Sequence, residues 1–122
     1  MTAAVDPCPI NPVVDLVFSR WTTPILWVLA RHGGMRFTEL ERLLGSITPK
    51  VLTQRLRQLE RDGLVHRTLY SEVPPRAEYR ITALGRSLSP VFDTLVTWSD
   101  THFGEVTCAR QKYDLAGRPR PA

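Results

Sequence analysis

Two helical segments separated by a turn of only about three residues constrain the fold of this chain most. The first segment is expected at about 38–44 and the second at 48–62, with residues 45–47 forming the turn. Thr48 is a good N-cap for the second helix, and Gly63 supplies the residue that ends it. This spacing is typical of a helix-turn-helix.

The preceding sequence predicts two more helices. A short one begins at Val13, because the prolines before it disfavour an earlier start, and another is expected over 25–31. In the first helix of the helix-turn-helix, Thr38 and Glu41 have the spacing of a capping box. The residues of that helix expected to face inward are Leu40, Leu43 and Leu44.

Beyond Gly63 the apolar pattern changes to a period of two, which predicts strands. The alternating residues are Val65, Arg67 and Leu69, and then Ala77, Tyr79 and Ile81. Two strands in this order predict a β-hairpin. Pro74-Pro75 cannot extend a ladder, so residues 71–76 should form a projecting tip with Arg76 at its edge.

The C-terminal part predicts one long helix. Thr82 can cap it, and apolar residues recur at helical spacing to about Phe103, with Pro90 expected to kink it. The tail at 104–122 is expected to be frayed. The predicted fold is α+β, mostly α: a single winged helix-turn-helix domain over 1–122, with its core at about 8–103, a two-stranded wing, and additional N- and C-terminal dimerisation helices.

Composition agrees with one folded domain and argues against a membrane span. The chain has 122 residues, of which 43% are hydrophobic and 23% charged. A membrane span needs about 18 to 20 consecutive apolar residues, whereas the apolar run at 25–30 is closed by Arg31. Residues 1–10 lack a basic segment followed by an apolar one, so a cytoplasmic location is expected.

The helix at 48–62 has two chemically distinct faces. At about 100° per residue, Leu52, Leu56 and Leu59 fall on one side. The residues on the opposite side are Lys50, Thr53, Gln54, Arg57 and Arg61. Lys and Arg suit phosphate or guanine, Gln suits adenine, and Thr suits phosphate or a thymine methyl. This face is suited to a DNA major groove.

An ordinary solvated helix face is the alternative interpretation, because most charged faces are no more than that. The surroundings favour DNA, since a short helix, a tight turn, a capped helix and a hairpin follow in order. Residues 48–80 hold seven Lys or Arg and four acidic residues, a surplus of three out of a net charge of +4. The positive charge is thus concentrated where the fold would place DNA.

Several motifs are shared with a known family. They are Cys8-Pro9, Arg20-Trp21, Arg36-Phe37-Thr38-Glu39-Leu40, the run Leu52 to Glu60, Asp62-Gly63-Leu64-Val65, Arg67, Glu78-Tyr79-Arg80-Ile81-Thr82 and Trp98. On these residues the chain resembles the HxlR-type branch of the MarR-like winged-helix regulators from Cys8 to Trp98. Ser19-Arg20-Trp21 departs from the usual Gly-Lys-Trp but keeps the basic-aromatic pair.

The resemblance implies a homodimer that binds double-stranded DNA at an inverted repeat and acts as a repressor of nearby genes. It makes 48–62 the recognition helix and 71–76 the wing. The expected DNA-binding residues are Pro49, Lys50, Thr53, Gln54, Arg57 and Arg76.

The two cysteines of the chain are candidates for sensing a redox signal. The family often carries a cysteine at the position of Cys8, which in some members senses oxidants or electrophiles. Cys8 and Cys108 are therefore candidate redox-sensing residues, and a disulfide between subunits is conceivable if terminal elements form the dimer. The other interpretation makes Cys8 structural or incidental, because reactivity needs a lowered thiol pKa that a sequence cannot show.

No catalytic, metal or cofactor site is expected. His32, His66 and His102 lie far apart without ligand spacing, and the chain has no nucleophile elbow or phosphate-binding loop. Two other functions remain open. A winged helix can dock another protein, and a small molecule could bind near Trp21, Trp27 and Trp98 at a dimer interface.

Overall fold

The computed structural model describes residues 10–117. Its elements are, in order, α1 (Asn11–Val17), α2 (Thr22–His32), β1 (Met35–Arg36), α3 (Phe37–Leu44), α4 (Pro49–Arg61), β2 (Val65–Tyr70), β3 (Arg76–Ile81), α5 (Ala83–Arg86) and α6 (Ser89–Ala116). The chain divides into two compact units, 1–89 and 90–122. The organisation as a single domain stays a prediction.

Helix α2 forms the centre of the first unit. Ile25, Leu26 and Leu29 are fully buried, and the helix packs against α1, α3 and β3. It begins three residues before the predicted start at Ile25, with Pro24 in its first turn, where the missing N–H costs no helical bond. It ends at Gly33, whose φ of 73° favours glycine.

Helices α3 and α4 form the predicted helix-turn-helix, with Gly45 at a φ of 79° ending α3. The expected capping box of Thr38 and Glu41 is wrong. Helix α3 begins one residue earlier, and the backbone N–H of its N-cap Arg36 donates to Glu39 Oε1 at 3.0 Å. Leu43, expected to face inward, is 49% exposed, because this short helix buries only one narrow stripe at Leu40.

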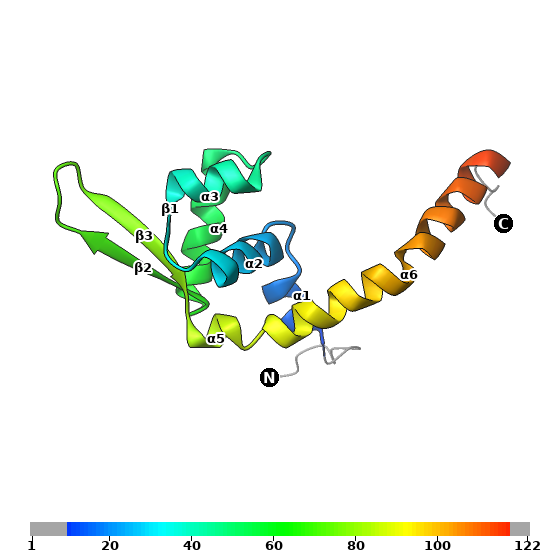
Figure 1. Cartoon of the computed structure of the whole chain (residues 1–122), viewed down its shortest axis with the longest axis horizontal. Coiled ribbons are helices and arrows are strands. Elements are labelled where there is room, and N and C mark those ends of the chain that lie inside the picture. Colours follow the sequence, from blue (N-terminus) through cyan, green and yellow to red (C-terminus); the bar gives the residue numbers. More distant parts are fainter. Residues whose placement is uncertain (1–9, 118–122) are drawn as a thin grey trace, which may run out of the picture. The chain divides into compact units, whose positions relative to one another are not determined.

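The predicted hairpin is present, and a third strand joins it. The antiparallel sheet has the order β1-β3-β2, so β3 is central. Val65 pairs with Ile81 at the base of the hairpin, and Tyr70 pairs with Arg76 near its tip. The pairing of Met35 with Tyr79 adds β1 to the expected two strands. The hairpin extends away from the helices of this unit (Figure 1), which completes the predicted winged helix-turn-helix fold.

The predicted long C-terminal helix is two helices. Thr82 caps α5, as expected, by accepting a hydrogen bond from the Gly85 backbone at 3.0 Å, and α5 ends at Arg86. Helix α6 begins at Ser89, so Pro90 lies in its first turn, where the missing N–H costs no helical hydrogen bond, and the expected position of Pro90 in the interior of a helix is wrong. The prediction of a frayed tail is wrong for 104–116, which continue α6.

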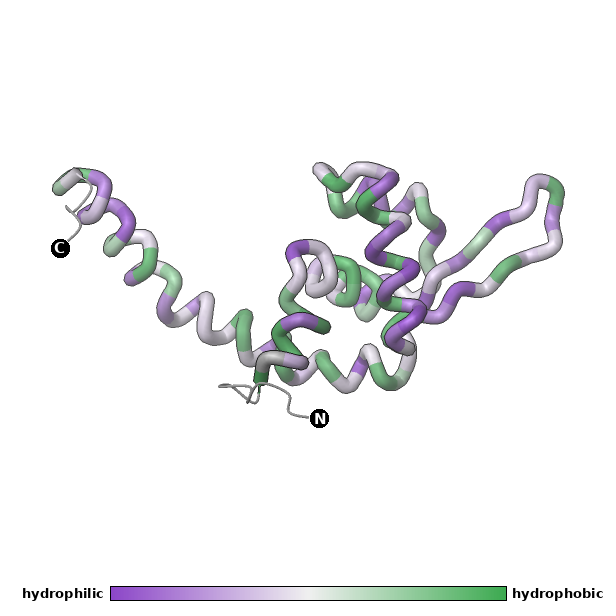
Figure 2. The backbone as a smooth tube through the Cα atoms, turned by 180° about the vertical axis from the view of Figure 1, so that it is seen from behind, coloured by the Kyte–Doolittle hydropathy of each residue, from purple (hydrophilic) through white to green (hydrophobic). Residues whose placement is uncertain are grey.

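Every helix of the described chain contains both apolar and polar residues (Figure 2). None of the helices within residues 10–117 combines the length and the apolarity that crossing a membrane requires.

Candidate nucleic-acid interface

Helix α4 has one buried and one exposed face. Leu52, Leu56 and Leu59 are at most 2% exposed and belong to the core of the first unit. Burial of three leucines fixes the rotation of the helix about its axis. The opposite face is therefore held toward solvent by the packing of the first one.

The exposed face carries the residues that the sequence predicts. Pro49, Lys50, Gln54 and Arg57 are exposed, and Thr53 is half-buried. The Thr53 hydroxyl donates to the carbonyl oxygen of Pro49 at 2.8 Å, so its hydrogen is used within the helix and its methyl group and lone pairs remain. These five residues lie together on one face of α4, and none of them carries a carboxylate.

Both ends of α4 are fixed by hydrogen bonds. The Thr48 hydroxyl accepts from the backbone N–H of Val51 at 3.2 Å. At the other end Gly63 has a φ of 77°, and the N–H of Leu64 donates to the carbonyl of Leu59 at 2.9 Å, which is the pattern of a Schellman motif. Leu64 then accepts from the backbone of Thr82 at 3.0 Å. The helix terminus is thus tied to the start of α5.

An ion pair and a tyrosine lie where α4 contacts the wing. Glu60 Oε1 is 3.7 Å from Arg67 Nε, and both side chains are about two-fifths exposed. Tyr79 pairs with Arg67 across the two wing strands. Burial raises the pKa of the Tyr79 phenol, an effect that Arg67 opposes and Glu60 reinforces. The phenol therefore remains protonated and uncharged at neutral pH.

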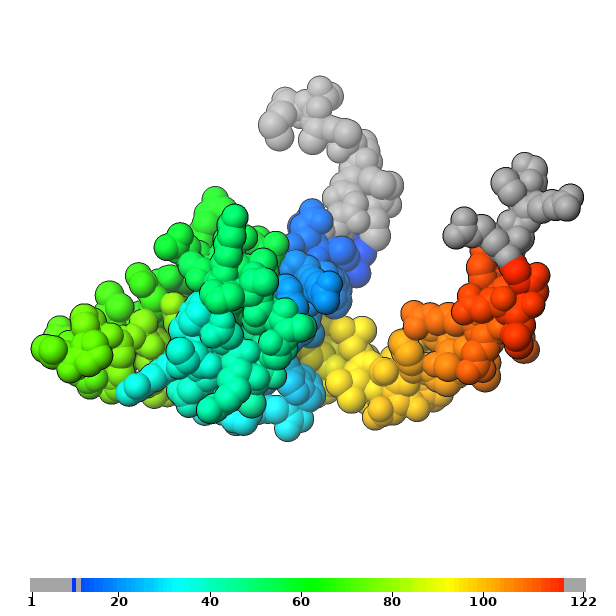
Figure 3. Space-filling view, turned by 90° about the horizontal axis from the view of Figure 1, so that it is seen from above, coloured from blue at the N-terminus to red at the C-terminus, as the bar shows by residue number. Residues whose placement is uncertain are grey.

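The wing presents Arg76 at the first position of β3. The predicted position beside the tip is confirmed, but the side chain is only 29% exposed. Its Nε lies 3.0 Å from Glu72 Oε2, and its guanidinium carbon lies 4.3 Å from the centre of the Tyr70 ring. The space-filling view shows the hairpin, in light green, projecting beyond the helices of this unit (Figure 3).

Sequence reasoning did not find Tyr70, Glu72 and Glu78, which contact Arg76. The hairpin register contains the signal for one of them, because a two-residue repeat in both strands places Tyr70 opposite Arg76. No sequence pattern indicates the contacts of Arg76 with the two carboxylates. Glu72 lies in the irregular tip, and the alternation of side chains along β3 permits several contacts besides the one between Arg76 and Glu78.

Neither candidate cysteine belongs to α4 or to the wing in sequence. Cys8 is outside the described residues. Cys108 has an exposed thiol on α6. His32 and His66 are exposed, and His102 Nδ1 is 3.1 Å from Glu105 Oε2. Between residues 10 and 117, no three metal-ligating side chains gather into a cluster.

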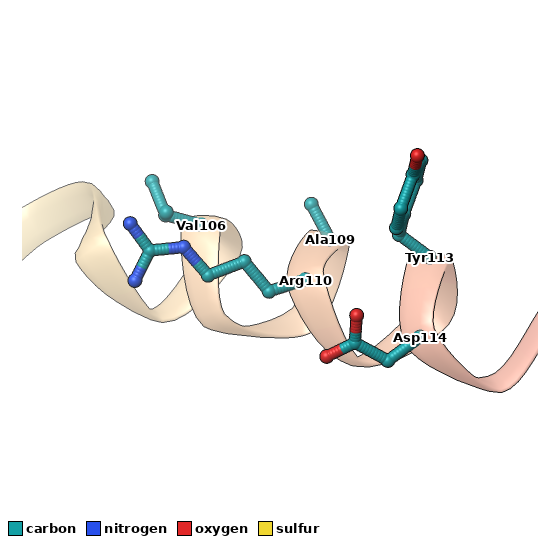
Figure 4. Close-up of a pocket in the computed structure, with 5 residues that line it drawn as sticks. All are labelled: Val106, Ala109, Arg110, Tyr113 and Asp114. Atoms are coloured by element: carbon teal, nitrogen blue, oxygen red, sulfur yellow. The ribbon is translucent and has the colours of Figure 1, made fainter. Parts of the chain in front are cut away.

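The tryptophans expected near a small-molecule site have different environments. Trp21 and Trp27 are half-buried, and the guanidinium of Arg31 lies 4.3 Å from the centre of the Trp27 ring. Trp98 is 51% exposed. The hollow in Figure 4 belongs to α6 alone and is lined by Val106, Ala109, Arg110, Tyr113 and Asp114. It encloses none of the three tryptophans.

A family model described as HxlR-like helix-turn-helix matches residues 16–107. The chain belongs to the HxlR-like helix-turn-helix family. The match includes α2, the helix-turn-helix, the wing and most of α6. This chain is therefore an HTH-type transcriptional regulator, and the resemblance found in its sequence is confirmed.

Known regulators are similar to this chain in sequence and in fold. The HTH-type transcriptional regulator YtcD of Bacillus subtilis is 40% identical over 97 residues, 80% of this chain and 76% of the relative. The redox regulator HypR in its reduced form superposes with a TM-score of 0.76 at 34% identity, over 83% of this chain and 99% of HypR. Diamide-treated YodB from B. subtilis superposes with a TM-score of 0.66 at 33% identity, over 77% of this chain and 93% of YodB.

Proposed function

We propose that this HxlR-like regulator binds an inverted repeat in duplex DNA as a homodimer and acts in the cytoplasm as a repressor. Helix α4 is the recognition helix and enters the major groove, while the wing at 71–76 reaches the neighbouring backbone or minor groove. The observation that carries this proposal is the exposed face of α4, which is basic and polar while the leucine face is buried.

The chemistry of that face suits base edges and phosphates. Lys50 and Arg57 can donate to guanine or to phosphate, and Gln54 can bind adenine with both its donor and its acceptor. The Thr53 methyl and the Pro49 ring can make apolar contacts with a thymine methyl. The wing adds Arg76 as a cation for the backbone. The exposed residues of α4 include no aromatic anchor of the kind that dominates protein-docking surfaces, which favours DNA over a protein partner.

Helix α6 supports the homodimer. Val91, Leu95, Trp98, Val106 and Tyr113 recur at helical spacing along one stripe, and all but the half-buried Val106 are more than 40% exposed. The Val106, Ala109 and Tyr113 side chains point to the same side of the helix (Figure 4). A second copy can bury this stripe against its own α6, as a two-fold interface requires. Exposed apolar residues on α1, among them Val13 and Val14, extend the same argument.

DNase footprinting of the intergenic region upstream of the gene tests DNA binding. The proposal predicts protection of two half-sites whose centres lie about one helical turn, or a whole number of turns, apart. Sedimentation equilibrium tests the dimer with Leu95→Glu and the matched variant Thr97→Glu, which changes an exposed residue on the opposite side of α6. Only Leu95→Glu should produce monomers. A monomeric parent or the absence of any protected site would contradict the proposal.

A thiol response is the second candidate, because the superposing structures include HypR in reduced and oxidised forms and YodB treated with diamide. In this chain Cys8 is the candidate sensor and Cys108, whose thiol is exposed, is the candidate partner. Two thiols would lose two protons and two electrons to diamide, which becomes the hydrazine, and the sulfurs would form one disulfide between subunits.

Non-reducing electrophoresis with and without diamide tests this response. The parent should form a covalent dimer and lose operator affinity, and dithiothreitol should reverse both changes. Cys8→Ser and Cys108→Ser should each remain monomeric on the gel. A Cys8→Ser variant that responds to diamide like the parent would contradict sensing by Cys8. Should operator affinity change with a small molecule and not with diamide, a ligand-responsive regulator would be the correct alternative.

A further inference from the structure

Glu78 is a nearly buried carboxylate between two arginines of the wing. Its side chain is 14% exposed, and it lies on the central strand of the sheet. Glu78 Oε1 is 2.8 Å from Arg80 Nη2, and Glu78 Oε2 is 4.0 Å from Arg76 Nη1. Because side chains alternate along a strand, Arg76, Glu78 and Arg80 share one face of the sheet. Burial of a carboxylate is costly unless cations or hydrogen-bond donors lie beside it.

Gly34 provides the space for this carboxylate. A Cβ atom at position 34 would overlap Glu78 Oε1, and it would lie 2.7 Å from Glu78 Cδ and 2.9 Å from Arg80 Nη2. Gly34 is not among the glycines with positive φ, so its backbone conformation is open to other residues. The absence of a side chain at position 34 is therefore explained by the carboxylate beside it.

Two other contacts hold Arg76. Glu72 Oε2 is 3.0 Å from Arg76 Nε, and the Tyr70 ring lies under the guanidinium. Within residues 10–117, neither Arg76 Nε nor Glu78 Oε1 has an aligned hydrogen-bond partner, so the cluster is held by charge and stacking. A guanidinium has five N–H donors. Both arginines thus keep donors for an additional acceptor.

We propose that Glu78 is a positioning residue that orders Arg76 and Arg80 for contact with nucleic-acid phosphates, an inference that rests on the proposed DNA binding. Long side chains lose rotamer freedom when they bind a phosphate, and a side chain already held in place loses less. Glu78 orders the two arginine side chains through its charge. The space left by Gly34 determines where that charge lies.

The sign of the effect on affinity distinguishes positioning from simple electrostatics. A carboxylate near DNA repels phosphates, so its removal should tighten binding if it acts only as a charge. If Glu78 positions the arginines, removal should weaken binding although the protein becomes more positive.

Glu78→Gln and Gly34→Ala remove the carboxylate from its place in two independent ways. The first keeps the shape and removes the charge, and the second keeps the charge and displaces it from Arg80. Matched controls are Glu105→Gln, an exposed carboxylate on α6, and Gly104→Ala, where an added Cβ has nothing within 4 Å. Operator affinity is measured by fluorescence anisotropy over a range of salt concentrations, and folding by urea unfolding of each variant.

If Glu78 positions the arginines, Glu78→Gln and Gly34→Ala should each bind the operator roughly 2- to 10-fold more weakly for each arginine that is no longer ordered. The slope of log K against log salt should fall by about 0.9 for each phosphate that the variant no longer neutralises, which a purely structural role would not change in a folded variant. The weakening caused by Glu78→Gln should disappear in an Arg76→Ala, Arg80→Ala background. The two control variants should match the parent.

Equal or tighter binding by folded Glu78→Gln overturns the inference. If that variant does not fold, Gly34→Ala decides the question by the same criteria. A parent that binds no DNA would refute the proposed function itself. The exchange of arginine Nε–H protons, followed by NMR without DNA, then distinguishes a failure of DNA binding from a failure of Glu78 to order the arginines. It should be faster for Arg76 and Arg80 in Glu78→Gln than in the parent, and equal rates would show that Glu78 orders neither side chain.

Discussion

The Thr48 hydroxyl accepts a hydrogen bond from the backbone N–H of Val51 at 3.2 Å and so begins α4. Thr48→Ala should lower the free energy of unfolding by about 1 kcal/mol, because one N–H of the first turn loses its acceptor. Thr53→Ala is the matched control in the same helix, since the Thr53 hydroxyl bonds only the carbonyl of Pro49. It should leave stability within about 0.5 kcal/mol of the parent. Urea unfolding measures both, and equal losses would contradict the cap.

Leu56 and Leu43 have the same side chain in opposite environments. Leu56 is 2% exposed and Leu43 is 49% exposed. Leu56→Ala should lower the free energy of unfolding by about 2 to 5 kcal/mol, because it leaves a cavity in the core. Leu43→Ala should cost much less, since solvent already reaches that side chain. If thermal and urea unfolding gave similar losses for the two variants, the outward placement of Leu43 would be wrong.

Tyr79 predicts a dependence of stability on alkaline pH. Burial raises the pKa of its phenol above the usual 10.0. The folded state then holds this proton at pH values where the unfolded state has lost it, so the stabilisation is complete below about pH 10 and declines as pH rises through the folded pKa. Tyr79→Phe should lack this part of the decline. Urea unfolding at pH 9 and 11 measures it, and identical pH dependence in both proteins would refute the assignment.

Arg57 and Arg76 should differ in how they affect operator binding. If Arg57 on α4 makes a bidentate base contact, Arg57→Ala should lose about 1 to 3 kcal/mol and relax sequence preference at one base pair. Arg76→Ala should weaken binding to all sequences alike and lower the salt slope by about 1. Competition assays with single-base operator variants measure both properties. Loss of sequence preference in the Arg76 variant alone would reverse the two roles.

Local signals predicted the elements that position the candidate interface. Thr48, Pro49 and Gly63 mark the ends of α4 in the sequence, and the period of its leucines gave the buried face. These features depend on residues within a few positions of one another. For that reason the helix, its rotation and the hairpin after it could be predicted before the structure.

Contacts between distant segments could not be predicted in the same way. Strand β1 has two residues, too few for a period, and exists because Met35 and Arg36 pair with β3. Helix α6 continues past Phe103 to Ala116, beyond its predicted end, because a single glycine such as Gly104 is tolerated within a long helix. The cluster around Glu78 likewise depends on Gly34, more than forty positions earlier, which no local pattern connects to it.

The most direct test is the operator affinity of a Lys50→Ala, Gln54→Ala, Arg57→Ala triple variant across salt concentrations. Its control replaces the same residue types outside α4 and the wing, at Arg86, Gln111 and Lys112, all exposed. The triple variant should fold like the parent, lose operator binding by about 100-fold or more and show a salt slope smaller by about two, while the control retains sequence-specific binding. Parental affinity and salt slope in the folded triple variant would contradict the assignment of α4 to the major groove.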